Sequence, residues 1–267
     1  MKAKLRSETG PLSGFVNVIP SAVATQAIAA AGADWILVDQ EHGMIGPESM
    51  HAMIAATAGT KCSPLVRVGK RDEALVKTAL DAGAEGLMFP LVRTAQEAAE
   101  CVALTRYPPA GRRGWGPFVA HSRWQVELGD YLAERGGETA VILLIETRDA
   151  VRNIEEIARV DGVDGMFIAQ FDLSNDLGVP GQFDSPEFIA AFDEAERAIL
   201  EAGIPVGAVA FTREQTHRIL ARGHRLLGHN FDVLMLKDVV RESMGWVRDA
   251  APALAPNHHA SRSGANR

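Results

Sequence analysis

Residues 141–169 read VILLIETRDAVRNIEEIARVDGVDGMFIA, and this stretch contains the unit that decides the fold. It begins and ends with nearly unbroken apolar runs, which predict strands at Val141–Ile145 and Gly165–Ala169. An amphipathic pattern between them predicts a helix over Ala150–Arg159. Strands without a polar face are typical of a parallel sheet that helices cover on both sides. The stretch therefore predicts a β–α–β unit of the α/β class.

The same alternation of short apolar runs and longer amphipathic runs extends along the chain in both directions. Six more strands are predicted at Phe15–Ile19, Trp35–Asp39, Pro64–Val68, Gly86–Pro90, Pro205–Val209 and Arg225–His229. Six more helices are predicted at Ser21–Ala31, Glu48–Ala58, Glu73–Ala82, Ala95–Arg106, Pro186–Ala202 and Arg213–Arg222. Eight strands alternating with helices predict a single (β/α)8 TIM barrel over residues 1–250. An open, doubly wound sheet is the alternative, because periodicity alone does not show closure.

A glycine recurs where a predicted helix gives way to a predicted strand. The four junctions are AGAD (31–34), AGAEG (82–86), DGVDG (161–165) and ARGHR (221–225). Glycine suits the left-handed residue on which helices commonly end. The junctions therefore predict four left-handed C-caps, as a weak internal repeat of βα units.

Two segments interrupt the alternation. Residues 107–135 are rich in proline, glycine and aromatic residues and are too long for a simple βα loop. Loops of this length are usually functional, so we expect the segment to help form a substrate pocket. Residues 251–267 (APALAPNHHASRSGANR) predict a disordered tail.

The composition excludes several classes of protein. The 267 residues include 27 basic and 34 acidic side chains, so a basic surface for nucleic acid or anionic lipid is not expected. No apolar run approaches the ~18 residues of a membrane span, and no signal peptide is visible. The two cysteines lie far apart without metal-type spacing, which is typical of a reduced, cytoplasmic protein.

Polar side chains follow four of the predicted strands, at the end where barrel enzymes carry their active sites. Asp39, Glu41 and His42 follow the second strand, and Arg67 lies near the end of the third. The fifth and sixth strands are followed by polar segments that read Glu146-Thr147 and Gln170-Phe171-Asp172-Leu173-Ser174. The sequence therefore predicts a site at this rim of the barrel.

Glu146 and Asp172 predict a metal site built on oxygen ligands. Two carboxylates with water and substrate oxygens suit Mg²⁺ or Mn²⁺ better than Zn²⁺. A second interpretation is structural: Glu146 would cap the helix that starts near Asp149, and Asp172 would cap a turn through Leu173-Ser174.

His42 is the candidate general base, because the pKa of histidine lies close to working pH. Asp39 would orient its imidazole, although Glu41 is an alternative partner or a solvated charge. Arg67 would hold a carboxylate or an enolate oxygen through its planar guanidinium, or would form an internal salt bridge with one of the same carboxylates. No lysine stands at a strand end, so a metal is a better candidate for the electron sink than a Schiff base.

The chain resembles the HpcH/HpaI aldolase family, the metal-dependent class II pyruvate aldolases. The resemblance extends from about Gly14 to Val247. DWILVDQEHG, PLVRV, LDAGAEGLMFPLVRTAQEAAE and RYPPAGRRGWGP match family segments in the right order. A fifth match is IETRDAVRNIEEIARVDGVDGMFIAQFDLSNDLGVPG. Several long matches in order are far more specific than any single motif.

The resemblance implies a TIM barrel in which Glu146 and Asp172 bind a divalent metal, Mg²⁺ or Mn²⁺ or else Co²⁺. His42 would be the acid/base residue, oriented by Asp39, and Arg67 would stabilise the pyruvate enolate. Backbone amides at Ala169, Gln170 and Phe171 would bind the pyruvate carboxylate. Family members are usually homohexamers, trimers of dimers that exchange the last helix. That helix would be about Phe231–Val247 here, and Asp81 would reach the neighbouring subunit's site.

The chain also departs from the family pattern. Ala169-Gln170 stands where the family has Gly-Pro, and Leu144 replaces a glutamine two residues before the metal glutamate. We therefore expect substrate preference to differ, while the metal and base residues are intact.

The expected reaction is reversible cleavage of a 4-hydroxy-2-oxo acid to pyruvate and an aldehyde. The alternative is decarboxylation of oxaloacetate to the same enolate, as in macrophomate synthase-like relatives. A binding or scaffolding protein on the same barrel would predict a broken site, which the sequence does not show.

Overall fold

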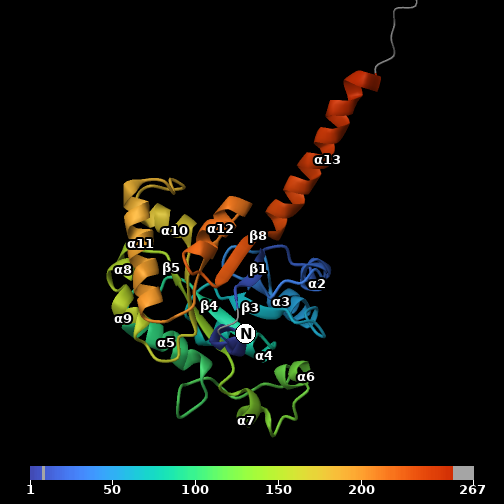
Figure 1. Ribbon diagram of the computed structural model, residues 1–267. Helices are drawn as coiled ribbons and strands as arrows, with labels where there is room; N and C mark the ends of the chain where they lie inside the picture. The colour runs from blue at the N-terminus through green and yellow to red at the C-terminus, as the bar shows by residue number, and fades with distance from the viewer. Residues whose placement is uncertain (8–9, 255–267) are drawn as a thin grey trace, which may run out of the picture. The chain divides into compact units, whose positions relative to one another are not determined.

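Eight parallel strands close into a barrel in the computed structural model, which describes residues 1–7 and 10–254 (Figure 1). The strands are β1 (Leu12–Asn17), β2 (Trp35–Asp39), β3 (Ser63–Arg67), β4 (Gly86–Phe89), β5 (Ala140–Ile145), β6 (Gly165–Ile168), β7 (Val206–Val209) and β8 (Leu226–Phe231). Each strand pairs with the next, and β8 pairs with β1 through Leu12 and Leu226. The predicted TIM barrel is therefore confirmed, and the open sheet is excluded.

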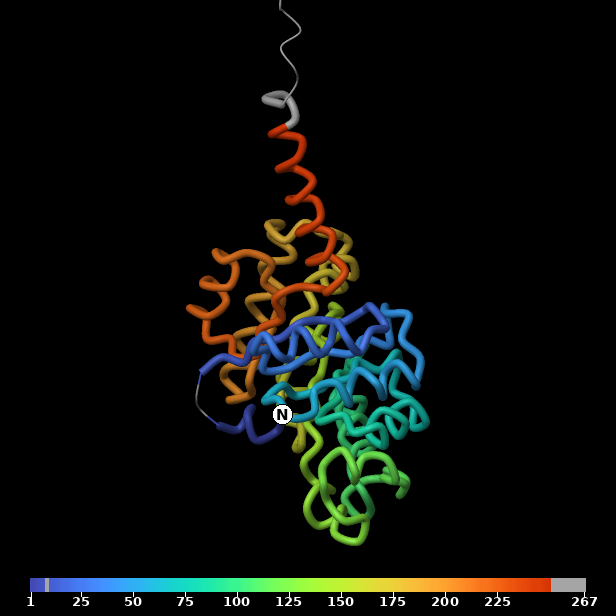
Figure 2. The backbone as a smooth tube through the Cα atoms, turned by 90° about the vertical axis from the view of Figure 1, so that its right-hand side faces the viewer, coloured from blue at the N-terminus to red at the C-terminus, as the bar shows by residue number. Residues whose placement is uncertain are grey.

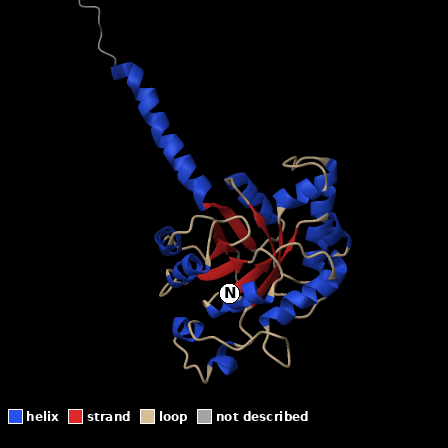
Figure 3. Cartoon of the chain, turned by 180° about the vertical axis from the view of Figure 1, so that it is seen from behind, coloured by secondary structure: helices blue, strands red, loops and turns tan. Residues whose placement is uncertain are grey.

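Helices surround the strands, as Figure 3 shows in blue around red. They are α2 (Ala22–Ala30), α3 (Pro47–Ala55), α4 (Glu73–Asp81), α5 (Ala95–Thr105), α8 (Arg148–Arg152), α9 (Ile154–Ala158), α11 (Pro186–Glu201) and α12 (Arg213–Ala221). The helix predicted over 150–159 is split into α8 and α9 at Asn153. Two further helices, α1 (Lys2–Arg6) and α10 (Gln170–Asp176), are too short for a periodic pattern and were not predicted.

All four glycines at the predicted junctions are left-handed, and three of them are confirmed as helix caps. Gly32, Gly83, Gly162 and Gly223 have φ angles of 101°, 99°, 93° and 90°. Gly32, Gly83 and Gly223 directly follow the C-cap residues of α2, α4 and α12, where a side chain would be strained. Gly162 lies four residues past Ala158, the last residue of α9, in the turn before β6. Gly32, Gly83 and Gly223 therefore end their helices before the chain enters the next strand.

The hydrophobic core has two layers. The larger layer fills the space between the strands and the helices, and the smaller fills the inside of the barrel around Trp35. Trp35 is fully buried and donates its indole N–H to the Leu12 carbonyl at 3.1 Å. A Cβ on Gly14 would lie only 2.1 Å from the Trp35 ring, so the ring fits because residue 14 has no side chain.

Residues 107–135 form a small subassembly with α6 (Ala120–Trp124) and α7 (Tyr131–Arg135). Tyr107, Ala120 and Tyr131 make its own buried cluster. Figure 2 shows the segment in green, at the end of the barrel that also carries the N-terminus. It shares a cavity there with α1, through Arg123, Trp124 and Arg135 among others. This segment therefore packs away from the carboxyl ends of the strands.

The chain divides into two compact units, residues 1–232 and 233–267. The second unit contains most of α13 (Asp232–Leu254), a helix whose apolar side chains Val233, Leu236, Val239 and Val240 are exposed. Residues 251–254 of the predicted tail are helical, and residues 255–267 lie outside the described residues. No helix within residues 1–7 and 10–254 combines the length and apolar character needed to cross a membrane.

Both cysteines, Cys62 and Cys101, are buried and unpaired. Burial raises the pKa of each thiol to about 12, so both are held in the neutral form.

Candidate active site

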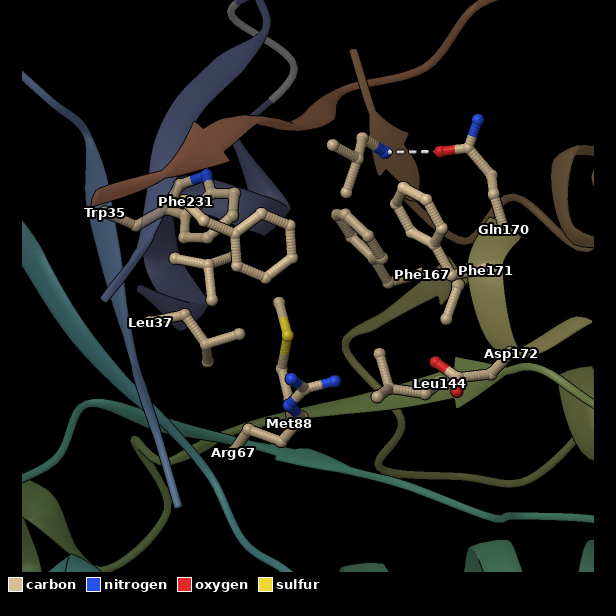
Figure 4. Close-up of a pocket in the computed structure, with 13 residues that line it drawn as sticks. Trp35, Leu37, Arg67, Met88, Leu144, Phe167, Gln170, Phe171, Asp172 and Phe231 are labelled. Atoms are coloured by element: carbon tan, nitrogen blue, oxygen red, sulfur yellow. Dashed lines mark hydrogen bonds between the residues drawn. The ribbon is translucent and has the colours of Figure 1, made fainter. Parts of the chain in front are cut away.

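A cavity opens at the carboxyl ends of the strands, where the sequence predicts a site (Figure 4). Its lining includes Val16, Trp35, Leu37, Arg67, Met88, Leu144, Phe167, Ala169, Gln170, Phe171, Asp172, Val209 and Phe231. The side chains of Arg67 and Asp172 point toward each other at one side of it. The lining is otherwise mostly apolar, so the polar groups act in surroundings that contain little water.

Asp39 and Arg67 form a buried ion pair, because the parallel register sets these two residues opposite each other at the ends of β2 and β3. Arg67 donates Nε–H to Asp39 Oδ1 at 2.9 Å and Nη2–H to Oδ2. Burial alone would raise the pKa of Asp39, but Arg67 outweighs it and holds that pKa below its ordinary value. The internal salt bridge considered as an alternative for Arg67 is therefore present, and Arg67 lines the cavity as well.

His42 lies in the loop after β2, and Asp39 fixes that loop through its backbone. Asp39 Oδ1 accepts the backbone N–H groups of Glu41 at 2.9 Å and His42 at 3.2 Å. The His42 side chain is 60% exposed, and its Nε2 lies 3.8 Å from Glu41 Oε2. Among the described residues, Asp39 bonds to Arg67 and to these backbone groups, so the carboxylate nearest the imidazole is Glu41. The expected contact between Asp39 and the imidazole is thus replaced by one with Arg67.

Glu146 is a buried carboxylate directly after β5. Burial raises its pKa to about 7, and the charges of Asp172 and Glu41 push in the same direction. Its Oε1 accepts the backbone N–H of Leu91 at 2.5 Å. The interpretation of Glu146 as a helix cap is wrong, because Thr147 is the N-cap of α8 and accepts the Ala150 N–H at 3.1 Å.

Asp172 lies in the first turn of α10, where the helix dipole favours a negative charge. It does not cap a turn, since the N-cap position belongs to Ala169, which has no side-chain oxygen. The start of α10 is fastened to β7, because Gln170 Oε1 accepts the Val209 N–H at 3.1 Å (Figure 4). Leu144, the departure from the family pattern, lies in the cavity wall.

Three features of the site were not predicted. Glu41 lies 3.3 Å from Arg67 Nη1, and burial raises its pKa above the ordinary value. Leu91 has a left-handed backbone, with φ of 55°, where it donates to Glu146. Met88 and Phe231 line the cavity from β4 and β8, but apolar strand residues give no sequence signal that separates a site from a core.

Other expected contributors lie elsewhere. No residue of 107–135 lines the cavity, so the expectation that this segment forms part of the substrate pocket within the chain is wrong. The reason is its separate aromatic cluster at the opposite end of the barrel. Asp81 is held by Arg113, whose Nη2 donates to Oδ1 at 2.8 Å.

The fold is a TIM barrel, and an arginine and carboxylates surround a cavity at the carboxyl ends of its strands. This is the arrangement found in enzymes of that fold class. Comparisons with known proteins identify the class further. Residues 15–238 match the HpcH/HpaI aldolase/citrate lyase family. The chain belongs to this family and is an enzyme of the aldolase/lyase type.

Two curated relatives are similar over most of the chain. A 4-hydroxy-2-oxo-heptane-1,7-dioate aldolase from Shigella sonnei is 37% identical over 85% of this chain and 86% of its own length. A hydroxypyruvate/pyruvate aldolase from Roseovarius nubinhibens is 34% identical over 85% and 88%. Among solved structures, a family protein from Burkholderia cenocepacia has a TM-score of 0.87 and 34% identity, covering 92% of this chain and 98% of its own.

Proposed function

We propose that the protein catalyses the reversible, divalent-metal-dependent cleavage of a 4-hydroxy-2-oxo acid to pyruvate and an aldehyde. The observation that carries this proposal is the group of charges at the cavity. Arg67 and Asp172 line it, and the buried Glu146 is electrostatically coupled to both. The relatives named as aldolases support the same reaction class.

Glu146 and Asp172 fit a divalent cation as two carboxylate ligands. Burial is the main cause of the raised pKa of Glu146, and the charges of Asp172 and Glu41 add to it; a bound cation would stabilise the ionised carboxylate. Within the described residues no three His, Cys, Asp or Glu side chains form a ready metal cluster, so water and substrate oxygens would complete the coordination. Mg²⁺ and Mn²⁺ suit such ligands, and Co²⁺ is a further candidate. When bound, the cation would stabilise negative charge on the substrate oxygens.

The chain's own residues would divide the remaining work. His42 would take the proton from the C4 hydroxyl, directly or through a water, from its exposed position in the loop after β2. The C3–C4 bond then breaks, C4 leaves as the aldehyde, and the electron pair of that bond stays with C3 and forms the pyruvate enolate. Arg67, held in place by Asp39, would stabilise the enolate oxygen, and C3 would then take up the proton that His42 removed, directly or through a water. Backbone amides at Ala169, Gln170 and Phe171 would bind the pyruvate carboxylate.

The test is exchange of the pyruvate methyl protons in D₂O, followed by NMR with Mg²⁺ or Mn²⁺ and then with EDTA. Exchange needs the enolate but no aldehyde, so it tests the chemistry without assuming the second product. We expect metal-dependent exchange that is lost in Glu146→Ala, Asp172→Ala and His42→Ala. Glu155→Gln, an exposed position on α9, is the matched control. Undiminished exchange in Glu146→Ala or Asp172→Ala would refute the metal assignment.

Oxaloacetate decarboxylation would give the same enolate, and the exchange experiment alone does not separate the two reactions. The ratio of kcat/KM for oxaloacetate to that for a hydroxy-oxo acid separates them. A ratio well above one would identify decarboxylation of oxaloacetate as the main reaction and refute the aldolase proposal.

We also propose a cytoplasmic homohexamer built as a trimer of dimers. The apolar side chains of α13 would be covered by a neighbouring subunit, and Asp81 would reach that subunit's site. Light scattering measures the assembly directly. A monomer at micromolar concentration would refute this part of the proposal.

A further inference from the structure

Three phenylalanines form a row beside the mouth of the active-site cavity. The Phe171 and Phe211 rings lie 5.8 Å apart at an interplanar angle of 71°, and the Phe211 and Phe231 rings lie 6.4 Å apart at 14°. The Phe183 and Phe171 rings lie 5.3 Å apart at 82°. These geometries are the edge-to-face and stacked arrangements that aromatic rings prefer. The row is therefore held in place by its own contacts.

Two of the three rings remain open to solvent. Phe171 is 48% exposed and Phe211 is 36% exposed, although side chains of this size gain most from burial. Exposed aromatic residues that adjoin one another at a cavity are typical of a binding surface.

The row is continuous with the reacting groups. Phe171 and Phe231 line the same cavity as Arg67 and Asp172, and Phe171 directly precedes Asp172 in α10 (Figure 4). A substrate whose oxo-acid end lies between Arg67 and Asp172 would extend its C4 substituent away from these charges. The aromatic row borders the cavity where that substituent would leave it.

The charges of the cavity disfavour a second carboxylate on the substrate. Of the residues that line it, Arg67 is the single cationic side chain, and Asp39 and Glu41 already pair with it. Asp172 adds negative charge. A distant carboxylate would lose hydration here without gaining a cationic partner.

We propose that the C4 substituent of the substrate, and therefore the aldehyde product, is aromatic or a long aliphatic chain. Phe171 and Phe211 bind this group, and Phe231 closes the row toward the cavity. This inference rests on the proposed aldolase function and narrows its substrate class.

The test compares two substrates that differ only at C4: 4-hydroxy-2-oxo-4-phenylbutanoate and 4-hydroxy-2-oxoheptanedioate. We expect wild-type kcat/KM to favour the phenyl compound by about tenfold or more, the scale of one well-placed ring contact. Phe171→Ala should lower the ratio of the two kcat/KM values by about tenfold, and Phe171→Leu, which keeps apolar bulk, should lower it less. Leu200→Ala, an exposed apolar position on α11, is the control and should leave the ratio unchanged.

Pyruvate methyl exchange by the wild-type enzyme keeps the two proposals apart. Exchange together with a preference for the heptanedioate would overturn the aromatic proposal and leave the aldolase standing. Absence of exchange would overturn both. A Phe171→Ala variant that changes the oligomeric state, with the ratio unaltered, would assign the row to subunit contacts and refute its role in substrate binding.

Discussion

Glu146→Gln is expected to stabilise the metal-free protein at neutral pH. The pKa of Glu146 is about 7 in the folded chain, because the carboxylate is buried and lies near the charges of Asp172 and Glu41. The ordinary value for glutamate is 4.5. Glutamine keeps the shape and an acceptor oxygen for the Leu91 N–H, but it cannot ionise. The substitution therefore isolates the free energy of placing this charge in the folded protein.

The magnitude is set by the difference between the two pKa values. They differ by about 2.5 units, and each unit corresponds to about 1.4 kcal/mol, so the full effect is about 3 kcal/mol. Below about pH 4.5 the carboxyl group is protonated in both the folded and the unfolded chain, and it favours neither. As the pH rises from about 4.5 to 7, the unfolded chain ionises first, so the wild-type protein loses stability relative to Glu146→Gln. Above about pH 7 the difference stays constant.

The assay is urea unfolding of both proteins in EDTA at several pH values between about 4.5 and 8, analysed by linear extrapolation. Glu155→Gln, exposed on α9, should track the wild type at every pH. Saturating Mg²⁺ or Mn²⁺ should raise the free energy of unfolding of the wild-type protein by about 2.7 kcal/mol at a hundred times the Kd. It should raise that of Glu146→Gln less. A difference between the two proteins that does not depend on pH, or that favours the wild type as the pH rises, would refute the reasoning.

Two further predictions concern the support of the site. Asp39→Asn leaves the buried Arg67 without its main partner and should destabilise the protein by about 3 kcal/mol in urea unfolding. Because Arg67 lowers the pKa of Asp39, this loss should be full above about pH 4 and shrink as the pH falls below it; a loss that persists at low pH would contradict the ion-pair account. Gly14→Ala places a Cβ 2.1 Å from the Trp35 ring and should destabilise by about 3 kcal/mol. Gly129→Ala is its control, because no atom lies within 4 Å of the Cβ that this substitution adds. Equal stability of the two variants would contradict the packing argument.

Much of the fold could be predicted from local patterns. The eight strands were predicted within about two residues at most ends, because a strand buried on both faces is an apolar run bounded by turn residues. The split at Asn153 was not predicted, because a periodic apolar pattern continues across it. Short helices such as α10 were not predicted, because seven residues contain too few repeats to establish a helical period.

The sequence predicted which residues form the candidate site but not which of them contact one another. Asp39, Arg67, Glu146 and Asp172 were predicted from their positions at or just after the strand ends, and all four lie at the carboxyl ends of the strands. The pairing of Asp39 with Arg67 depends on the register between β2 and β3, which neither strand encodes alone.

The sequence by itself determined the alternation of strands and helices, the glycines that end three of the helices, and the polar residues at the strand ends. These depend on periodicity and backbone preference, which are local properties of the chain. Closure of the barrel, the raised pKa of Glu146 and the row of Phe171, Phe211 and Phe231 were decided only by the tertiary structure. Each depends on groups from different strands and loops that meet in space, and both the desolvation of a charge and the stacking of rings are set by such neighbours.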